Sequence, residues 1–190
     1  MLLNFAQVKS YQNVEWRLFD KDGNPKPIFQ ENGLFRWLMK KGIVSPHFPK
    51  IPFLLGYWTN KKVVRNLVTN AGFALNAGLL SGVGSPATVG YIALGTGTTP
   101  ASATDTALQA EITTGGLARA AATKSLVTTS VTNDTAQFLY TFTASANFAV
   151  TESGLFNAAS GGTLFAHQVF AAINVNSGDN LQVTWKVQEH

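Results

Sequence analysis

The chain has no cysteine among its 190 residues. This absence excludes disulfide bonds, thiol catalysis and thiolate metal ligands. No apolar run reaches the roughly 18 residues that a membrane-spanning helix needs, and residues 1–11 lack the layout of a signal peptide. We therefore expect a protein that contacts no membrane and is made without a cleaved leader.

Charged residues are scarce as well, at 13% of the chain, whereas 45% of the residues are hydrophobic. Much of the surface must therefore be neutral and polar, or be covered by another chain. The charges are unevenly divided: residues 1–65 hold eleven basic and four acidic residues, and residues 66–190 hold three basic and six acidic ones. This asymmetry predicts that the basic part meets an acidic surface, either a nucleic acid or an acidic protein shell.

The sequence contains no recognisable catalytic constellation. Residues 95–97 (Gly-Thr-Gly) follow a predicted strand, but neither a third glycine nor a Lys-Ser/Thr pair follows them, which excludes dinucleotide and P-loop fingerprints. Glu111 and Glu152 are the carboxylates embedded in apolar segments, yet nothing marks them as a hydrolytic pair. We predict that the protein is not an enzyme and uses no cofactor.

Metal binding is not expected either. Asp20, Asp22, Asn24 and Glu31 match ligand positions of a calcium loop, but Pro25 stands where that loop requires glycine, so a hairpin turn is the preferred interpretation. The three histidines lack the spacing of metal ligands and fit structural or exposed roles: His47, His167 and His190.

Residues 1–65 are interpreted as a basic, aromatic N-terminal arm. Residues 14–29 predict a small hairpin, and residues 31–41 predict a helix with Asn32 as its N-cap. Residues 45–58 place three prolines among aromatic residues, which predicts an extended segment without a regular element. Such an arm either docks on another molecule, which we prefer, or folds back over its own domain.

Residues 66–190 are interpreted as a β-sandwich domain. A helix is predicted at residues 67–82, capped by Thr69 or Asn70, with Gly72 and Gly78 allowing close packing on a sheet. Turn signals separate strands that alternate apolar and polar residues, predicted at residues 91–94, 117–132, 136–143, 149–156, 163–175 and 180–187. The predicted fold class is mainly β: an antiparallel, jelly-roll-like sandwich with one or two short helices and an extended N-terminal arm.

The stretch from Tyr91 to Ile112 organises this domain. Gly95 and Gly97 predict a turn through φ values that other residues avoid. Asp105 then predicts the N-cap of a short helix over residues 106–112, because Leu108 and Ile112 are four positions apart and would share one face.

Five segments of this domain occur in a recognisable order: residues 67–72 (LVTNAG), 91–97 (YIALGTG), 104–112 (TDTALQAEI), Arg119 and residues 151–156 (TESGLF). The series resembles bacteriophage virion structural proteins, notably the N-terminal domain of tail-collar fibre proteins. The resemblance implies a non-enzymatic part of the virion, assembled in the host cytoplasm and often oligomeric. Because no fibre shaft follows the last strand, we expect a capsid decoration or minor capsid protein, or a tail adaptor.

We expect the N-terminal arm to dock on major capsid or tail and baseplate subunits, and the protein to form a homo-oligomer. Tryptophan, tyrosine and arginine dominate interface energetics, so the predicted interface residues are Trp16, Arg36, Trp37, Phe48, Phe53, Tyr57 and Trp58. The alternative is a carbohydrate-binding, adhesin-like receptor-binding tail protein that uses loops near Gly95 and Gly161. Nucleic-acid binding ranks last, because the basic residues are scattered among prolines.

Overall fold

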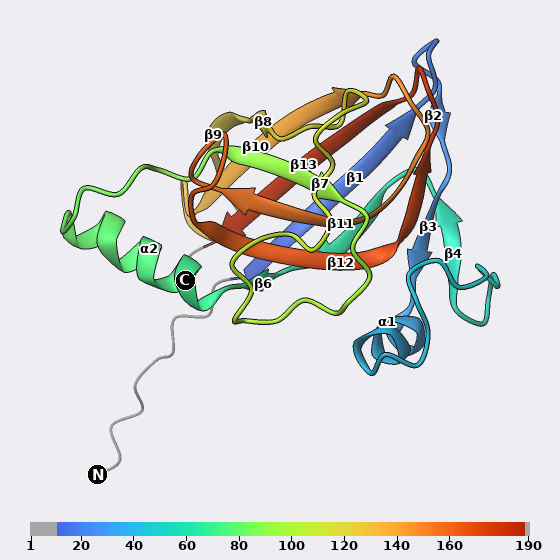
Figure 1. Cartoon of the computed structure of the whole chain (residues 1–190), viewed down its shortest axis with the longest axis horizontal. Coiled ribbons are helices and arrows are strands. Elements are labelled where there is room, and N and C mark those ends of the chain that lie inside the picture. The colour runs from blue at the N-terminus through green and yellow to red at the C-terminus, as the bar shows by residue number, and fades with distance from the viewer. Residues whose placement is uncertain (1–10, 189–190) are drawn as a thin grey trace.

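The structure is a computed structural model that describes residues 11–188. In these residues the chain forms thirteen strands and two helices (Figure 1). In chain order they are β1 (Tyr11–Phe19), β2 (Pro25–Lys26), β3 (Ile28–Glu31), α1 (Gly33–Lys40), β4 (Gly56–Thr59), β5 (Lys62–Arg65), β6 (Leu67–Val68), α2 (Asn70–Ser81), β7 (Tyr91–Gly95), β8 (Ala120–Ala121), β9 (Thr123–Val127), β10 (Thr135–Thr143), β11 (Phe148–Phe156), β12 (Leu164–Val175) and β13 (Asn180–Gln188).

Two antiparallel sheets lie face to face and form a sandwich (Figure 1). The first sheet has the strand order β2-β1-β13-β10-β9, with β5 also paired to β1, and the second has the order β6-β12-β11-β7-β8. The predicted fold class, a mainly β antiparallel sandwich, is confirmed. The strands predicted between residues 117 and 187 correspond to β8 to β13.

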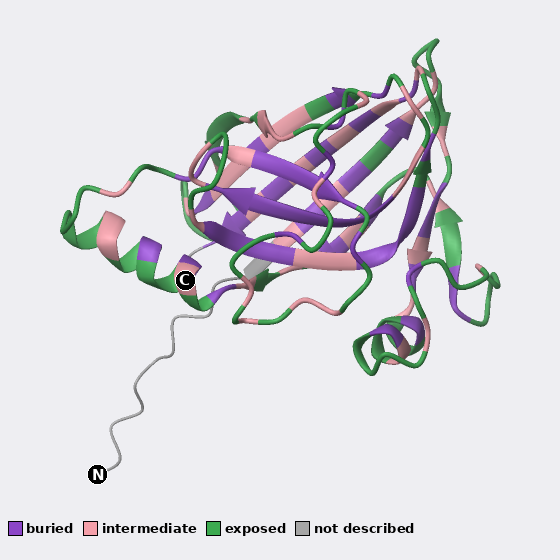
Figure 2. Ribbon diagram, viewed as in Figure 1, coloured by how far each residue is buried: buried purple, intermediate pink, exposed green. Residues whose placement is uncertain are grey.

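Alternating side chains of the first sheet fill the space between the sheets. Val183 and Trp185 of β13 are fully buried, and so are Val14 and Trp16 of β1 beside them. Strands β11 and β12 of the second sheet are buried along most of their length, and Figure 2 shows them largely purple, with a pink stretch within β12. The alternating burial of β1 and β13 matches the period-two pattern of the sequence, whereas the long buried runs of β11 and β12 are covered on both faces.

Strand β1 corrects the interpretation of residues 1–65 as an arm. It pairs with β13 over nine residues, from Tyr11 opposite Gln188 to Phe19 opposite Asn180. Strand β5 pairs with the other edge of β1. Both strands therefore belong to the sandwich, and their long-range pairing explains why local patterns did not place them there.

Both predicted long helices are confirmed, with the expected caps. The Asn32 side chain accepts a hydrogen bond from the Phe35 N–H of α1 at 3.0 Å, and Thr69 accepts one from Gly72 of α2 at 2.9 Å. A side chain at Gly72 would collide with the carbonyl of Phe165 in β12, so glycine allows the close packing of helix on sheet. Neither helix of the described part has the length and apolarity that a bilayer crossing requires.

The short helix predicted at residues 106–112 is wrong. These residues form an irregular stretch with bends and a single bridge, and the Ile112 N–H donates to the carbonyl of Leu94 in β7 instead of to a helical carbonyl. Leu108 and Ile112 are both buried, although they belong to an irregular loop. Their spacing of four residues therefore does not indicate the apolar face of a helix.

Residues 28–59 protrude from one end of the sandwich and are called the lobe below (Figure 1). Strands β3 and β4 pair with each other, and α1 packs beside them. A small hydrophobic cluster holds the lobe together and includes one residue of the sandwich: Phe29, Phe35, Met39, Leu55 and Ala171. Tyr57 and Trp58 lie in β4, so the prediction that residues 45–58 contain no regular element is wrong at this end.

A buried ion pair fastens the lobe to the sandwich. Lys62 Nζ of β5 lies 2.6 Å from Glu31 Oε2 of β3, and both side chains are fully buried. Lys62 also donates a hydrogen bond to the carbonyl of Ala171 in β12 at 2.8 Å. Nearby, the Ala172 N–H donates to the carbonyl of Pro46 at 3.0 Å. The proline-rich segment therefore folds back onto its own domain.

Candidate interaction surface

The stretch from Gly95 to Ile112 is tied to the second sheet by one carboxylate. Glu152 of β11 is fully buried. Its Oε1 atom accepts hydrogen bonds from the N–H groups of Gly97 at 2.9 Å and Ala110 at 2.8 Å. Its Oε2 atom accepts one from the Gln109 N–H at 3.1 Å and contacts His167 Nε2 at 3.0 Å. The carboxylate thus replaces the backbone partners that an irregular loop lacks.

His167 of β12 bridges two carboxylates. Its Nδ1 atom lies 2.8 Å from Asp105 Oδ2, on the far side of the ring from Glu152. Burial alone would lower the pKa of His167, but its hydrogen bonds to Glu152 and Asp105 raise it above the ordinary value. Burial alone would raise the pKa of Glu152, but the hydrogen bonds from His167 and the backbone hold it below the ordinary value. Each ring nitrogen of His167 thus faces a carboxylate oxygen, an arrangement that favours the imidazolium form.

Gly95 and Gly97 are required by close approach and not by a left-handed turn. Neither has a positive φ, which corrects the turn predicted from the sequence. A Cβ atom at either position would overlap the carboxylate of Glu152. Only glycine lets the backbone reach this side chain.

A second ion pair locks the neighbouring loop. Arg119 forms a bidentate pair with Glu111, with N–O distances of 2.9 and 2.7 Å. Its guanidinium lies 3.6 Å from the ring centroid of Phe156 and also donates to the carbonyls of Ala158 and Gly161. The loop at Gly161, which was considered for glycan binding, is therefore held in place by contacts within the chain.

These groups stabilise the loop and the sheet through contacts within the chain. Glu152 and His167 are fully buried, and each polar atom discussed above already has a partner within the chain. In residues 11–188 no group of three or more His, Cys, Asp or Glu side chains is arranged to hold a metal ion. The sequence did not reveal that Glu152, His167 and Asp105 meet, because they come from three separate segments.

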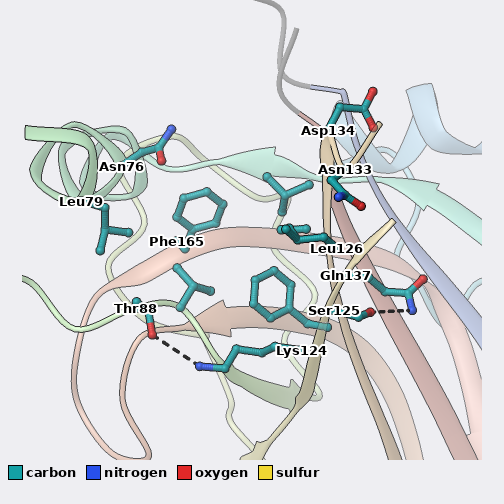
Figure 3. Close-up of a pocket in the computed structure, with 14 residues that line it drawn as sticks. Asn76, Leu79, Thr88, Lys124, Ser125, Leu126, Asn133, Asp134, Gln137 and Phe165 are labelled. Carbon is teal, nitrogen blue, oxygen red and sulfur yellow. Dashed lines mark hydrogen bonds between the residues drawn. The ribbon is translucent and has the colours of Figure 1, made fainter. Parts of the chain in front are cut away.

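A groove of about 610 Å³ opens between α2 and strands β9 and β10 (Figure 3). Apolar side chains form much of its wall: Leu79, Val89, Leu126, Phe138, Phe165 and Val187. Lys124 contributes a cation, whose Nζ contacts the Thr88 hydroxyl at 3.4 Å. The sequence did not reveal this groove, because its wall combines residues from four strands, α2 and the loops between them.

The seven residues predicted to dock do not share one surface. Trp16 is fully buried against Phe170, with ring centroids 4.6 Å apart. It belongs to the core because its alternating neighbours in β1 face the opposite sheet, so its prediction as an interface residue is wrong. The other six lie in the lobe and are exposed to solvent: Arg36, Trp37, Phe48, Phe53, Tyr57 and Trp58.

A family model described as podophage GP4 fiber I protein gp80 matches residues 68–187, which is more than half of the chain. The chain belongs to this podophage fibre family. Membership makes the protein a structural component of a phage virion, whereas the resemblance to tail-collar proteins is not confirmed. No curated protein and no solved structure matches the chain.

The family match covers α2, the stretch pinned by Glu152 and strands β7 to β13. The lobe and strands β1 to β6, apart from Val68, lie outside it. Fibre families are typically non-enzymatic, which agrees with the structural role of the buried carboxylates.

Proposed function

We propose that the protein attaches to a neighbouring virion subunit through the lobe, as a tail adaptor or as a capsid decoration or minor capsid component. Membership of a fibre family supports the tail over the capsid. We also infer that the protein is a homo-oligomer, because repeated parts of an assembly commonly associate around a symmetry axis.

The concentration of exposed apolar side chains in the lobe carries this proposal. Fifteen large hydrophobic side chains are exposed in the described residues, and nine of them belong to residues 28–59. Large exposed apolar patches on soluble proteins mark interaction sites. The lobe also has aromatic residues of the kind that dominate interfaces.

At the tip of the lobe, the backbone conformation itself directs an aromatic side chain into solvent. Phe53 is 99% exposed and has a φ of 66°, in the left-handed region that bulky residues rarely adopt. Hydrogen bonds fix the turn, because Phe53 N–H donates to the Gly56 carbonyl at 2.8 Å and Leu55 N–H to the Ile51 carbonyl at 3.0 Å. A strained turn that presents an aromatic ring to solvent is consistent with a docking role.

Trp58 presents a second aromatic ring beside this turn. It is 50% exposed, packs edge-on against Phe29 with a centroid distance of 5.6 Å, and lies beneath the Lys50 ammonium. A ring already held in place loses little conformational entropy on binding. Trp58 is therefore suited to act as an anchor.

The proposal is tested by producing phage whose copies of the protein carry Phe53→Ser or Trp58→Ala. Truncating an interface anchor costs about 2 kcal/mol or more of association free energy, so quantitative immunoblots of purified particles should show less protein per particle. Phe73→Ala is the matched control, because Phe73 is 59% exposed on α2, outside the lobe. Normal incorporation of both lobe variants, with the sandwich folded, would contradict docking through the lobe.

Immunogold labelling of purified particles distinguishes the possible locations. Label at the tail supports an adaptor, and label over the shell supports a decoration or minor capsid protein. Label at the free ends of fibres, together with glycan binding by the full chain, would favour the carbohydrate-binding alternative.

A further inference from the structure

A second concavity, of about 260 Å³, lies at the junction of the lobe and the sandwich. Its cations come from two elements: Arg36 and Lys40 from α1, and Arg65 from the end of β5. Residues of β6, β12 and the loop at residues 98–101 complete the wall. All three basic residues line the same concavity although Arg65 is distant in sequence from α1.

These three cations have no anionic partner within the part of the chain that the structure describes. The ion pairs formed by residues 11–188 involve other basic residues, and none includes Arg36, Lys40 or Arg65. The one carboxylate of the lobe, Glu31, is buried against Lys62. Like charges gathered around one concavity repel each other, and an anion placed among them relieves this repulsion.

The floor of the pocket includes an edge of the second sheet. Strand β12 pairs with β6 only at Ala166 and His167. The lobe contacts the same strand again at Ala172. Gln168 and Val169 lie between these contacts and line the pocket. An extended peptide can place its backbone along such an edge while its side chains enter the pocket.

We propose that this pocket binds the carboxylate of an acidic side chain in an extended segment of a neighbouring polypeptide. The proposal rests on the proposed docking function and adds the chemistry of the partner. Arg36 and Arg65 each carry a planar guanidinium group. Such a group can pair with a carboxylate through two parallel hydrogen bonds.

The lining residues favour an acidic peptide over an acidic glycan. They include no aromatic ring on which a sugar could stack and no carboxylate that could accept hydrogen bonds from sugar hydroxyls. A pocket of about 260 Å³ also fits a side chain better than a chain of sugar rings.

The test uses the full chain and a fluorescein-labelled hexaglutamate peptide, with binding followed by fluorescence anisotropy at low salt. Arg36→Gln combined with Arg65→Gln should weaken binding about tenfold or more, since both guanidinium partners of the carboxylate are lost. The control, Lys21→Gln combined with Lys186→Gln, removes the same charge elsewhere and should change the affinity less than about twofold. Thermal unfolding checks that all variants remain folded.

Three outcomes would overturn the proposal. Equal weakening in the control variant would show attraction by net charge alone. Pocket-dependent binding of polygalacturonate without binding of hexaglutamate would assign the site to an acidic glycan. Absence of hexaglutamate binding to the unaltered chain would leave no acidic-peptide site.

The incorporation of lobe variants into particles tests the docking function independently of peptide binding by the pocket. If Phe53→Ser and Trp58→Ala both enter particles normally, docking through the lobe fails, whereas the affinity of the pocket for hexaglutamate is still measured in solution. If the lobe variants are depleted from particles but the unaltered chain does not bind hexaglutamate, docking through the lobe stands and the pocket proposal fails, so the two failures are distinguishable.

Discussion

Replacing Glu152 by glutamine should destabilise the sandwich strongly, although the two side chains have the same shape. Both carboxylate oxygens of Glu152 accept two hydrogen bonds each. Glutamine offers one oxygen and one amino group. If the oxygen faces Gly97 and Ala110, the amino group faces the Gln109 N–H; if the amide is flipped, the Gly97 and Ala110 N–H groups lose their acceptor.

The magnitude follows from these contacts. A buried donor left without an acceptor costs about 1–3 kcal/mol, and a hydrogen bond to a charged group contributes about 1.5–3 kcal/mol. The variant loses at least one backbone acceptor and the carboxylate–imidazolium contact with His167. We therefore expect Glu152→Gln to lower the free energy of unfolding by about 3–5 kcal/mol, a large share of a typical total of about 5–15 kcal/mol.

Urea unfolding followed by tryptophan fluorescence measures this loss, because Trp16 and Trp185 are buried in the core. Amide hydrogen exchange adds a local measurement: the N–H groups of Gly97, Gln109 and Ala110 should lose protection. Asp22→Asn is the control, since that carboxylate is exposed and should change stability by less than about 0.5 kcal/mol. A loss below about 1 kcal/mol for Glu152→Gln, with unchanged amide protection, would refute the assigned role of the carboxylate.

Two other buried charges give testable predictions. Lys62→Met leaves Glu31 buried without its partner and should cost about 3–5 kcal/mol in urea unfolding, whereas adding Glu31→Leu should restore most of the loss; equal stability of the single and double variants would contradict the ion pair. The raised pKa of His167 stabilises the fold fully below its ordinary value of 6.5, and this contribution is lost as pH rises through the raised value. The lowered pKa of Glu152 acts in the opposite sense, with a contribution present above 4.5 and lost as pH falls through the lowered value. The unfolding free energy should therefore fall above about pH 6.5, and His167→Gln should remove that part of the pH dependence; an identical pH profile for that variant would count against the imidazolium.

The strands of the second half were predictable because alternation is a local signal. Period-two patterns predicted β10 and β13, and turn residues marked their ends. The helix predicted after Asp105 failed because Leu108 and Ile112 have helical spacing although they are buried from a loop. The N–H groups of that loop bond to Glu152, which lies more than 40 residues away, and no local pattern carries that information.

Which of the seven predicted interface residues are exposed was predictable only in part. Tryptophan is enriched both in cores and at interfaces, so its type alone did not separate Trp16 from Trp58. The separating signal is alternation, since Val14, Trp16 and Leu18 share one face of β1 and all three are buried. The basic pocket could not be predicted, because the approach of Arg65 to α1 depends on the tertiary placement of the lobe.

The position of β1 shows how the lobe is connected to the part of the fold that the family match covers. The family match begins at residue 68, yet β1 lies beside β13 in the first sheet and contributes Trp16 to the core. Burying one tryptophan contributes about 4–6 kcal/mol by area alone, so the matched region depends on a strand outside the match. The lobe is inserted between β1 and β5, which pair with each other, and Lys62 of β5 holds Glu31 of the lobe. A force applied to the lobe would therefore act on two strands of the sandwich at once, which suits the attachment role proposed for the lobe.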